Sequence, residues 1–188
     1  MRLNLKDGPW PDAKAAPVAV LTLKGNFMNR LIRSAAFALM LFPAMGSAQD
    51  FDVGLEAYEV GDYATALREW TPLAEQGDMW AQKNLGIMYE YGQGVPQDYA
   101  EAVKWYRLAA DQGHADAQTN LGVMYATGEG VPQDYVTAHM WFNIGAANGD
   151  TDAATNRDKV AAKMLPADIS EAQRRAKVCM ASGYQDCD

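Results

Sequence analysis

Residues 81–116 read AQKNLGIMYEYGQGVPQDYAEAVKWYRLAADQGHAD, and residues 117–152 repeat the pattern as AQTNLGVMYATGEGVPQDYVTAHMWFNIGAANGDTD. The two copies are contiguous and share 19 of their 36 residues. A fixed period of this length is typical of supersecondary units that stack because no single unit can bury its own apolar face. The sequence therefore predicts a solenoid of stacked units instead of one closed core, and a solenoid offers an extended surface to a partner.

The first half of each copy carries an apolar stripe at helical spacing, formed in the first copy by Ala81, Leu85, Met88 and Tyr89. Gly86 and its counterpart Gly122 lie inside this expected helix. An internal glycine costs about 1 kcal/mol relative to alanine, so its repetition needs a reason. We expect a neighbouring helix to pass close to both glycines.

A loop rich in glycine and proline divides each copy into two helices. Its sequence is GQGVPQD at residues 92–98 and GEGVPQD at residues 128–134, and these residues break a helix. The paired glycines do not form a dinucleotide-binding fingerprint, because that motif needs a preceding strand and a third glycine. We expect the second helices over residues 99–112 and 135–148.

Three polar residues recur at 36-residue steps, each directly after a glycine: Asp78, His114 and Asp150. This position predicts helix N-caps, and it makes His114 a cap instead of a ligand. The other histidine, His139, replaces Val103 of the preceding copy. We expect His139 at the surface or at the edge of a groove.

The repeat pattern extends weakly in both directions. Residues 50–80 form a shorter unit in which Gly61 and Asp62 replace the long loop, and residues 153–188 form a degenerate unit with polar substitutions. Terminal units of a solenoid need a polar outer face, so the second segment is expected to be a capping hairpin. Its last helix should begin near Pro166 and end near Ser182.

Residues 28–48 resemble a secretory signal peptide, with Arg30 and Arg33 before an apolar run and small residues before Gln49. The apolar run is too short to span a bilayer, and cleavage is expected after Ala48. A signal peptide acts from the N-terminus, so we interpret residues 1–27 as a non-translated extension and Met28 as the start. The resulting localisation is the periplasm or the exterior.

Charge and cysteine content narrow the possible partners. From Gln49 onward the chain has 10 Lys and Arg against 22 Asp and Glu, a net charge of −12. Nucleic acid and anionic lipid both require a basic surface, so neither is an expected partner, and no stable membrane insertion is expected. Cys179 and Cys187 are expected to form a disulfide in an oxidising compartment, with two free thiols as the alternative. No metal site and no cofactor are predicted, because neither histidine lies in a Cys/His cluster.

The LGxxY of the first helix, the GxGVPQDYxxAxxW that follows and the closing AAxxG resemble the Sel1-like repeat, a relative of the tetratricopeptide repeat. The match covers residues 81–152, while residues 50–80 resemble a tetratricopeptide unit more closely. The resemblance implies an all-α fold, a right-handed α-solenoid of helical hairpins in which the first helix of each pair lines a concave groove. It also implies an adaptor or regulator in protein complexes.

The resemblance places the partner-binding residues beside each LGxxY motif: Lys83, Asn84, Ile87, Glu90 and Tyr91 in one unit, and Thr119, Asn120, Val123, Ala126 and Thr127 in the next. Asn84 and Asn120 lie one repeat apart, so their amides could bond the backbone of an extended peptide or the backbone of the neighbouring hairpin. Trp80 is among the aromatic residues that could anchor a partner.

The sequence thus favours an exported, monomeric, non-enzymatic adaptor that binds a protein or peptide segment. One alternative is a β-lactam-binding or β-lactam-hydrolysing enzyme, after a disulfide-rich branch of the family whose repeats carry cysteine pairs. Residues 81–152 contain no cysteine, and the sequence has none of the common hydrolase motifs. The other alternative is a structural subunit held permanently in an envelope complex, which would expose a large apolar patch when isolated.

Overall fold

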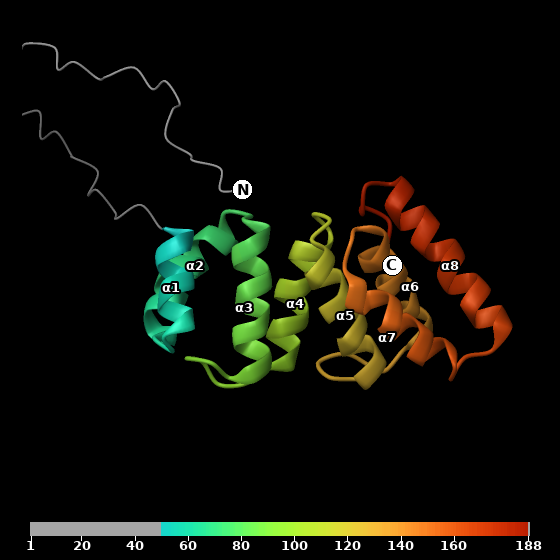
Figure 1. The fold of residues 1–188 in the computed structure, drawn as a ribbon, viewed down its shortest axis with the longest axis horizontal. Coiled ribbons are helices and arrows are strands. Elements are labelled where there is room, and N and C mark those ends of the chain that lie inside the picture. Colours follow the sequence, from blue (N-terminus) through green and yellow to red (C-terminus); the bar gives the residue numbers. More distant parts are fainter. Residues whose placement is uncertain (1–49, 188) are drawn as a thin grey trace, which may run out of the picture. The chain divides into compact units, whose positions relative to one another are not determined.

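The computed structural model describes residues 50–187, which contain eight helices and no strand (Figure 1). The helices are α1 (Phe51–Glu59), α2 (Tyr63–Glu75), α3 (Met79–Tyr91), α4 (Tyr99–Ala110), α5 (Ala115–Thr127), α6 (Tyr135–Ala147), α7 (Thr151–Ala161) and α8 (Pro166–Ala181). The first three pairs form antiparallel hairpins that stack in chain order. The last pair, the predicted C-terminal capping hairpin, differs, because α7 and α8 both pack against α6 and not closely against each other. The predicted all-α solenoid is confirmed. The predicted signal peptide at residues 28–48 and the extension at residues 1–27 lie outside the described residues.

Side-chain caps start the helices where the sequence places them. Asp78, His114 and Asp150 each accept a hydrogen bond from a backbone N–H in the first turn of the following helix, as predicted. Asp98 and Asp134, the last residues of the two long loops, cap α4 and α6 in the same way. Such bonds satisfy N–H groups that have no partner within the helix, and so they fix where each hairpin turns.

Glycine in the first helix of each hairpin lets the second helix approach. Gly122 on α5 faces Phe142 on α6, and a Cβ added to this glycine would lie 2.7 Å from the phenylalanine ring. Gly86 faces Tyr106 on α4 in the same way. The close approach predicted at both glycines is confirmed, and the aromatic ring takes the space that a side chain would need.

The side chain of His139 differs from its expected exposure. His139 was expected at the surface or a groove edge, but this prediction is wrong, because only 2% of the residue is exposed. It lies on α6, which packs against both α7 and α8, and Nδ1 of His139 is 3.2 Å from the amide nitrogen of Asn143. Helices α7 and α8 cover His139, which would lie at the surface of an isolated hairpin of α5 and α6.

Buried glutamines link successive hairpins. Gln118 donates from Nε2 to the carbonyl oxygen of Ala110 at 3.0 Å, and its Oε1 accepts from Nδ2 of Asn148 at 2.8 Å. The first bond satisfies a carbonyl at the C-terminal end of α4, where no helical partner exists. The same two bonds occur 36 residues earlier among Gln82, Ala74 and Gln112.

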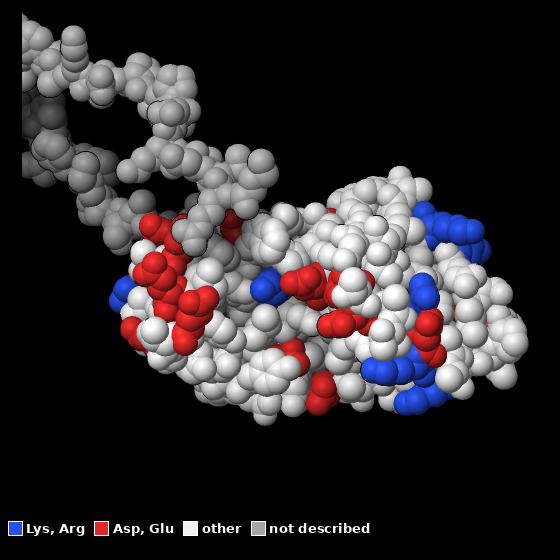
Figure 2. All heavy atoms as spheres, in the orientation of Figure 1, with Lys and Arg blue, Asp and Glu red and all other residues white. Residues whose placement is uncertain are grey.

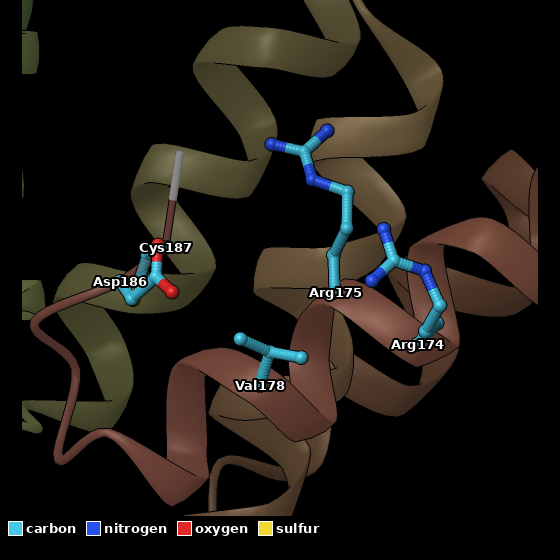
Figure 3. A pocket seen from close by; sticks show the side chains of 5 residues that line it. All are labelled: Arg174, Arg175, Val178, Asp186 and Cys187. Atoms are coloured by element: carbon cyan, nitrogen blue, oxygen red, sulfur yellow. The ribbon is translucent and has the colours of Figure 1, made fainter.

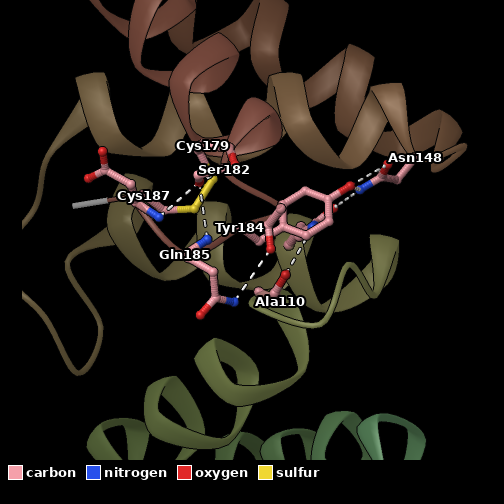
Figure 4. Close-up of a disulfide and its surroundings, with 10 residues drawn as sticks. Ala110, Asn148, Cys179, Ser182, Tyr184, Gln185 and Cys187 are labelled. Atoms are coloured by element: carbon pink, nitrogen blue, oxygen red, sulfur yellow. Dashed lines mark hydrogen bonds between the residues drawn. A yellow bond between two sulfur atoms is a disulfide. The ribbon is translucent and has the colours of Figure 1, made fainter.

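The C-terminal tail continues this arrangement (Figure 4). A disulfide joins Cys179 on α8 to Cys187, as predicted, and the tail between them folds back on the array. The hydroxyl of Tyr184 bonds the amide of Asn148 at 2.8 and 3.0 Å, and the tyrosine ring lies against Gly113. Tyr184 follows Asn148 by 36 residues, so the tail returns to the register of the repeats.

Candidate partner-binding groove

The first helices of three successive hairpins enclose a hollow of about 390 Å³ on one face of the array. Its lining comes from α3, α5 and the start of α7: Lys83, Ile87, Asp116, Thr119, Asn120, Val123, Asp150, Asp152 and Asn156. Successive turns of each helix supply these positions, because residues three and four apart share a helix face. We call this hollow the groove.

Five of the predicted partner-binding residues line the groove: Lys83, Ile87, Thr119, Asn120 and Val123. The structure therefore brings together residues from two repeats that are 36 positions apart in sequence. Ile87 and Val123 contribute apolar side chains to this lining, and Asn120, whose side chain also interacts with the hydroxyl of Tyr106, contributes a polar one. This mixture is typical of sites that hold a peptide segment.

Five predicted residues, Ala126 among them, lie outside the groove lining. Asn84 is only 8% exposed, and Tyr91 is exposed at the end of α3. Glu90 accepts a hydrogen bond from the buried hydroxyl of Tyr106, and Thr127 donates to the carbonyl of Val123. Glu90 and Thr127 are thus engaged within the protein, at the end of the helices where the long loops begin.

The groove is acidic on the side of α5 and α7. Asp116, Asp150 and Asp152 face one amine, that of Lys83. None of these four side chains forms an ion pair with another described residue. Burial lowers the pKa of Lys83 below its usual value, and the nearby charge of Asp116 opposes this shift. Figure 2 shows acidic side chains gathered over α1 and again near the middle of the array.

A second hollow of about 240 Å³ adjoins the groove and shares Asp116 with it. Trp80, which is 50% exposed, lies edge to face with His114, with 4.3 Å between the ring centroids. His114 is 5% exposed; its Nδ1 accepts from the N–H of Ala117, while its Nε2 is buried without a hydrogen-bond partner. Burial lowers the pKa of His114, and Asp116 opposes this. We call this hollow the Trp80 pocket.

The acidic residues of the groove were not predicted as site residues. Asp116 follows the cap His114 by two positions, and Asp152 follows the cap Asp150 in the same way. The repeat register could have shown that both face the same groove, since they are 36 residues apart. Asn156 on α7 carries no such signal, because the repeat motif is lost after residue 152.

A third hollow, of about 150 Å³, lies between α8 and the disulfide-bonded tail (Figure 3). Arg174 and Arg175 project beside it, opposite Asp186. Arg174 pairs with Glu171, and Arg175 donates to the hydroxyl of Thr137 at 3.2 Å. The Arg175 bond joins α8 to α6, whereas the Arg174 pair lies within α8, and this hollow is distant in sequence from the predicted groove residues.

Neither a metal-holding cluster nor a membrane-spanning helix is found in the part of the chain that the structure describes. Within residues 50–187, no three His, Cys, Asp or Glu side chains are arranged to hold a metal ion, so the groove aspartates do not form a metal site. In the same range, no helix combines the length and apolarity that a membrane span requires. The chemistry present is that of hydrogen bonds, charge and apolar contact.

The fold defines a class of protein, the all-α helical repeat solenoid. Within this class, the chain belongs to the Sel1 repeat family. The family model described as Sel1 repeat matches residues 81–114 and 115–150. Proteins with such repeats generally mediate protein–protein interactions and typically serve as non-catalytic scaffolds.

Two solved structures illustrate the relationship. A Sel1 repeat protein from Oxalobacter formigenes is 35% identical with a TM-score of 0.53, over 58% of this chain and 85% of its own. The protein c5321, described as a protective antigen of uropathogenic Escherichia coli with an SLR fold, is 28% identical with a TM-score of 0.67. That match covers 71% of this chain but only 30% of c5321. No curated protein matches this chain.

Proposed function

We propose that this chain is an exported adaptor or regulator that binds a segment of a partner protein in the groove. The observation that supports this most directly is the convergence of five predicted residues from two repeats on one hollow. The site consists of Lys83, Ile87, Thr119, Asn120 and Val123, with Asn84, Glu90, Tyr91 and Thr127 toward its margins. A segment bound across α3, α5 and α7 would contact each repeat once.

The proposal of export depends on two features. The first is the signal-peptide pattern at residues 28–48, with cleavage near Ala48 and residues 1–27 as a non-translated extension. The second is the disulfide between Cys179 and Cys187, since disulfides persist in oxidising compartments such as the periplasm. The exported chain then comprises the units 50–80, 81–116, 117–152 and 153–188.

A crosslinking capture from envelope extract tests this function, using the full chain and two matched variants. The groove variant is Lys83→Ala/Ile87→Ala on α3. The control variant, Lys104→Ala/Leu108→Ala on α4, removes the same kinds of side chain at the same spacing, from exposed positions outside the groove. We expect wild type and control to capture the same protein and the groove variant to lose it.

Two other outcomes of the capture experiment would have different meanings. Equal capture by the groove variant would place binding on another face and contradict the proposal. A partner that co-purifies at fixed stoichiometry and cannot be exchanged would instead support a structural subunit of an envelope complex. Both variants should keep the circular dichroism spectrum and melting temperature of a folded chain, because all four side chains are at least partly exposed.

A further inference from the structure

The acidic side of the groove has an excess of charge that the described protein does not neutralise. Asp116, Asp150 and Asp152 supply three carboxylates against the single amine of Lys83. In residues 50–187 only a few acidic side chains, such as Glu101, Asp158 and Glu171, have a basic partner within 4 Å. The groove carboxylates have none and line the same hollow, and this concentration of unpaired negative charge points to a ligand that brings positive charge.

We infer that the segment bound in the groove is basic, and that one of its lysine or arginine side chains enters the Trp80 pocket beside Asp116. This inference rests on the proposed function and adds the chemistry of the partner. The aliphatic part of such a side chain can lie on the half-exposed indole of Trp80, while its charge approaches Asp116. Cations and aromatic faces attract each other, most strongly for tryptophan.

The buried histidine supplies a separate indication that this pocket accepts a ligand. His114 is at least nine-tenths buried, and its Nδ1 is used as an acceptor for the helix cap, which leaves the proton on Nε2. This N–H has no partner in the protein. A buried donor without an acceptor is costly, and a backbone carbonyl of a bound segment could satisfy it once the exposed Trp80 side chain moves aside.

Lys83 explains why the site suits a peptide segment better than a small cation. Its amine is half-buried in the groove without an ion pair, so it needs an acceptor as well. A basic peptide provides both kinds of group, since its backbone carbonyls accept from Lys83 and its side chains bind the aspartates. An acidic segment would bring negative charges close to the three groove carboxylates, and this repulsion disfavours its binding.

The test measures fluorescence anisotropy of a labelled peptide of alternating lysine and alanine, with the full chain and at two salt concentrations. The same peptide with glutamate in place of lysine is the comparison. We expect the basic peptide to bind, with Kd rising about tenfold from about 50 mM to about 300 mM salt, because salt screens exposed charges. We expect the acidic peptide not to bind.

Three variants locate the binding. Asp116→Asn/Asp152→Asn removes two groove charges from exposed side chains that accept no hydrogen bond within the described residues, and should raise Kd about tenfold. Glu75→Gln/Asp186→Asn removes two exposed charges elsewhere and should change Kd less than twofold. Peptide binding should also alter tryptophan emission in wild type, and this change should be absent in Trp80→Phe.

Equal binding of the acidic peptide, no binding of the basic one, or unchanged binding in the groove variant would overturn the inference. The capture experiment separates this failure from that of the proposed function. If Lys83 and Ile87 are needed to capture a protein but the basic peptide does not bind, only the charge assignment is wrong. If both experiments fail, the groove is not a binding site.

Discussion

Gly86 on α3 lies so close to Tyr106 on α4 that a Cβ added to the glycine would be 2.4 Å from Cε1 of the tyrosine ring. Tyr106 is fully buried and its hydroxyl donates to Glu90, so the ring has no room to retreat. Inserting a methyl group into such a contact typically costs 1–3 kcal/mol. Alanine is the better helix former by about 1 kcal/mol, which offsets part of this cost.

We therefore expect Gly86→Ala to lower the free energy of unfolding by up to about 2 kcal/mol, measured by urea denaturation. The check is a double-mutant cycle with Tyr106→Ala, which removes the ring. In that background the same glycine substitution should become neutral or stabilising. A loss of equal size with and without the ring would show that the contact is not the cause.

The glutamine links between hairpins predict a second loss of stability. Gln118→Leu removes both bonds, so that the carbonyl of Ala110 keeps only the N–H of Gly113 and the amide of Asn148 keeps only Tyr184, and we expect a loss of about 2 kcal/mol, about 1 kcal/mol for each bond. Gln133→Leu is the control, because Gln133 also donates to a backbone carbonyl, that of Ala126, but is exposed. Its effect should stay within about 0.5 kcal/mol, and similar losses in both variants would argue against a role for burial.

The disulfide should stabilise the C-terminal tail. Cys187→Ser frees residues 183–187 from α8, and we expect a loss of about 2 kcal/mol in thermal or urea denaturation. A reducing agent should lower the stability of wild type by a similar amount and leave that of the variant unchanged. A variant that still responds to the reducing agent would contradict this assignment.

The buried cap His114 predicts a pH dependence. Its pKa is lowered by burial and by Lys83, although Asp116 opposes the shift. Between this lowered value and the ordinary value of about 6.5, the unfolded chain therefore binds more protons than the folded one. The contribution of neutral His114 to the free energy of unfolding is fully present above about pH 6.5, and it is lost as the pH decreases through this window.

His114→Asn keeps a side chain that can cap α5 and removes the titrating group, so stability should fall less between about pH 7 and about pH 5. Denaturation at each pH gives the slope. His139, whose pKa is also lowered by burial, should leave a residual slope in this variant. The same slope in wild type and variant would mean that His114 does not titrate in this range.

The sequence predicted most of the fold because its signals are local and repeated. The caps Asp78, His114 and Asp150 each act within one turn, and Gly86 marks a contact that recurs at Gly122. The groove was predicted where the motif itself continues, on α3 and α5. Its acidic side was missed for two reasons. Helix α7 contributes to it only after the repeat motif has been lost, and each groove aspartate on α5 and α7 lies two residues after a cap residue, so that only the cap was recognised.

Long-range packing explains why the predicted exposure of His139 was wrong. The burial of His139 depends on α7 and α8, which lie beyond the repeat in which that residue was analysed. The contact of Tyr184 with Asn148 depends on the tail returning to a 36-residue spacing after the repeat motif has been lost, with tyrosine where the repeats carry Gln112 and Asn148. Neither relationship can be read from a single unit.

The 36-residue spacing between Asn148 and Tyr184 has a consequence for how such a protein can gain further repeats. Two of the tail's contacts are with features that each full repeat supplies, an amide at the position of Asn148 and a glycine at the position of Gly113. A tandem duplication of residues 117–152 would present both features again, one unit further along. The existing C-terminal segment could then close the lengthened array without any compensating mutation, so gene duplication alone could lengthen the groove by whole repeats.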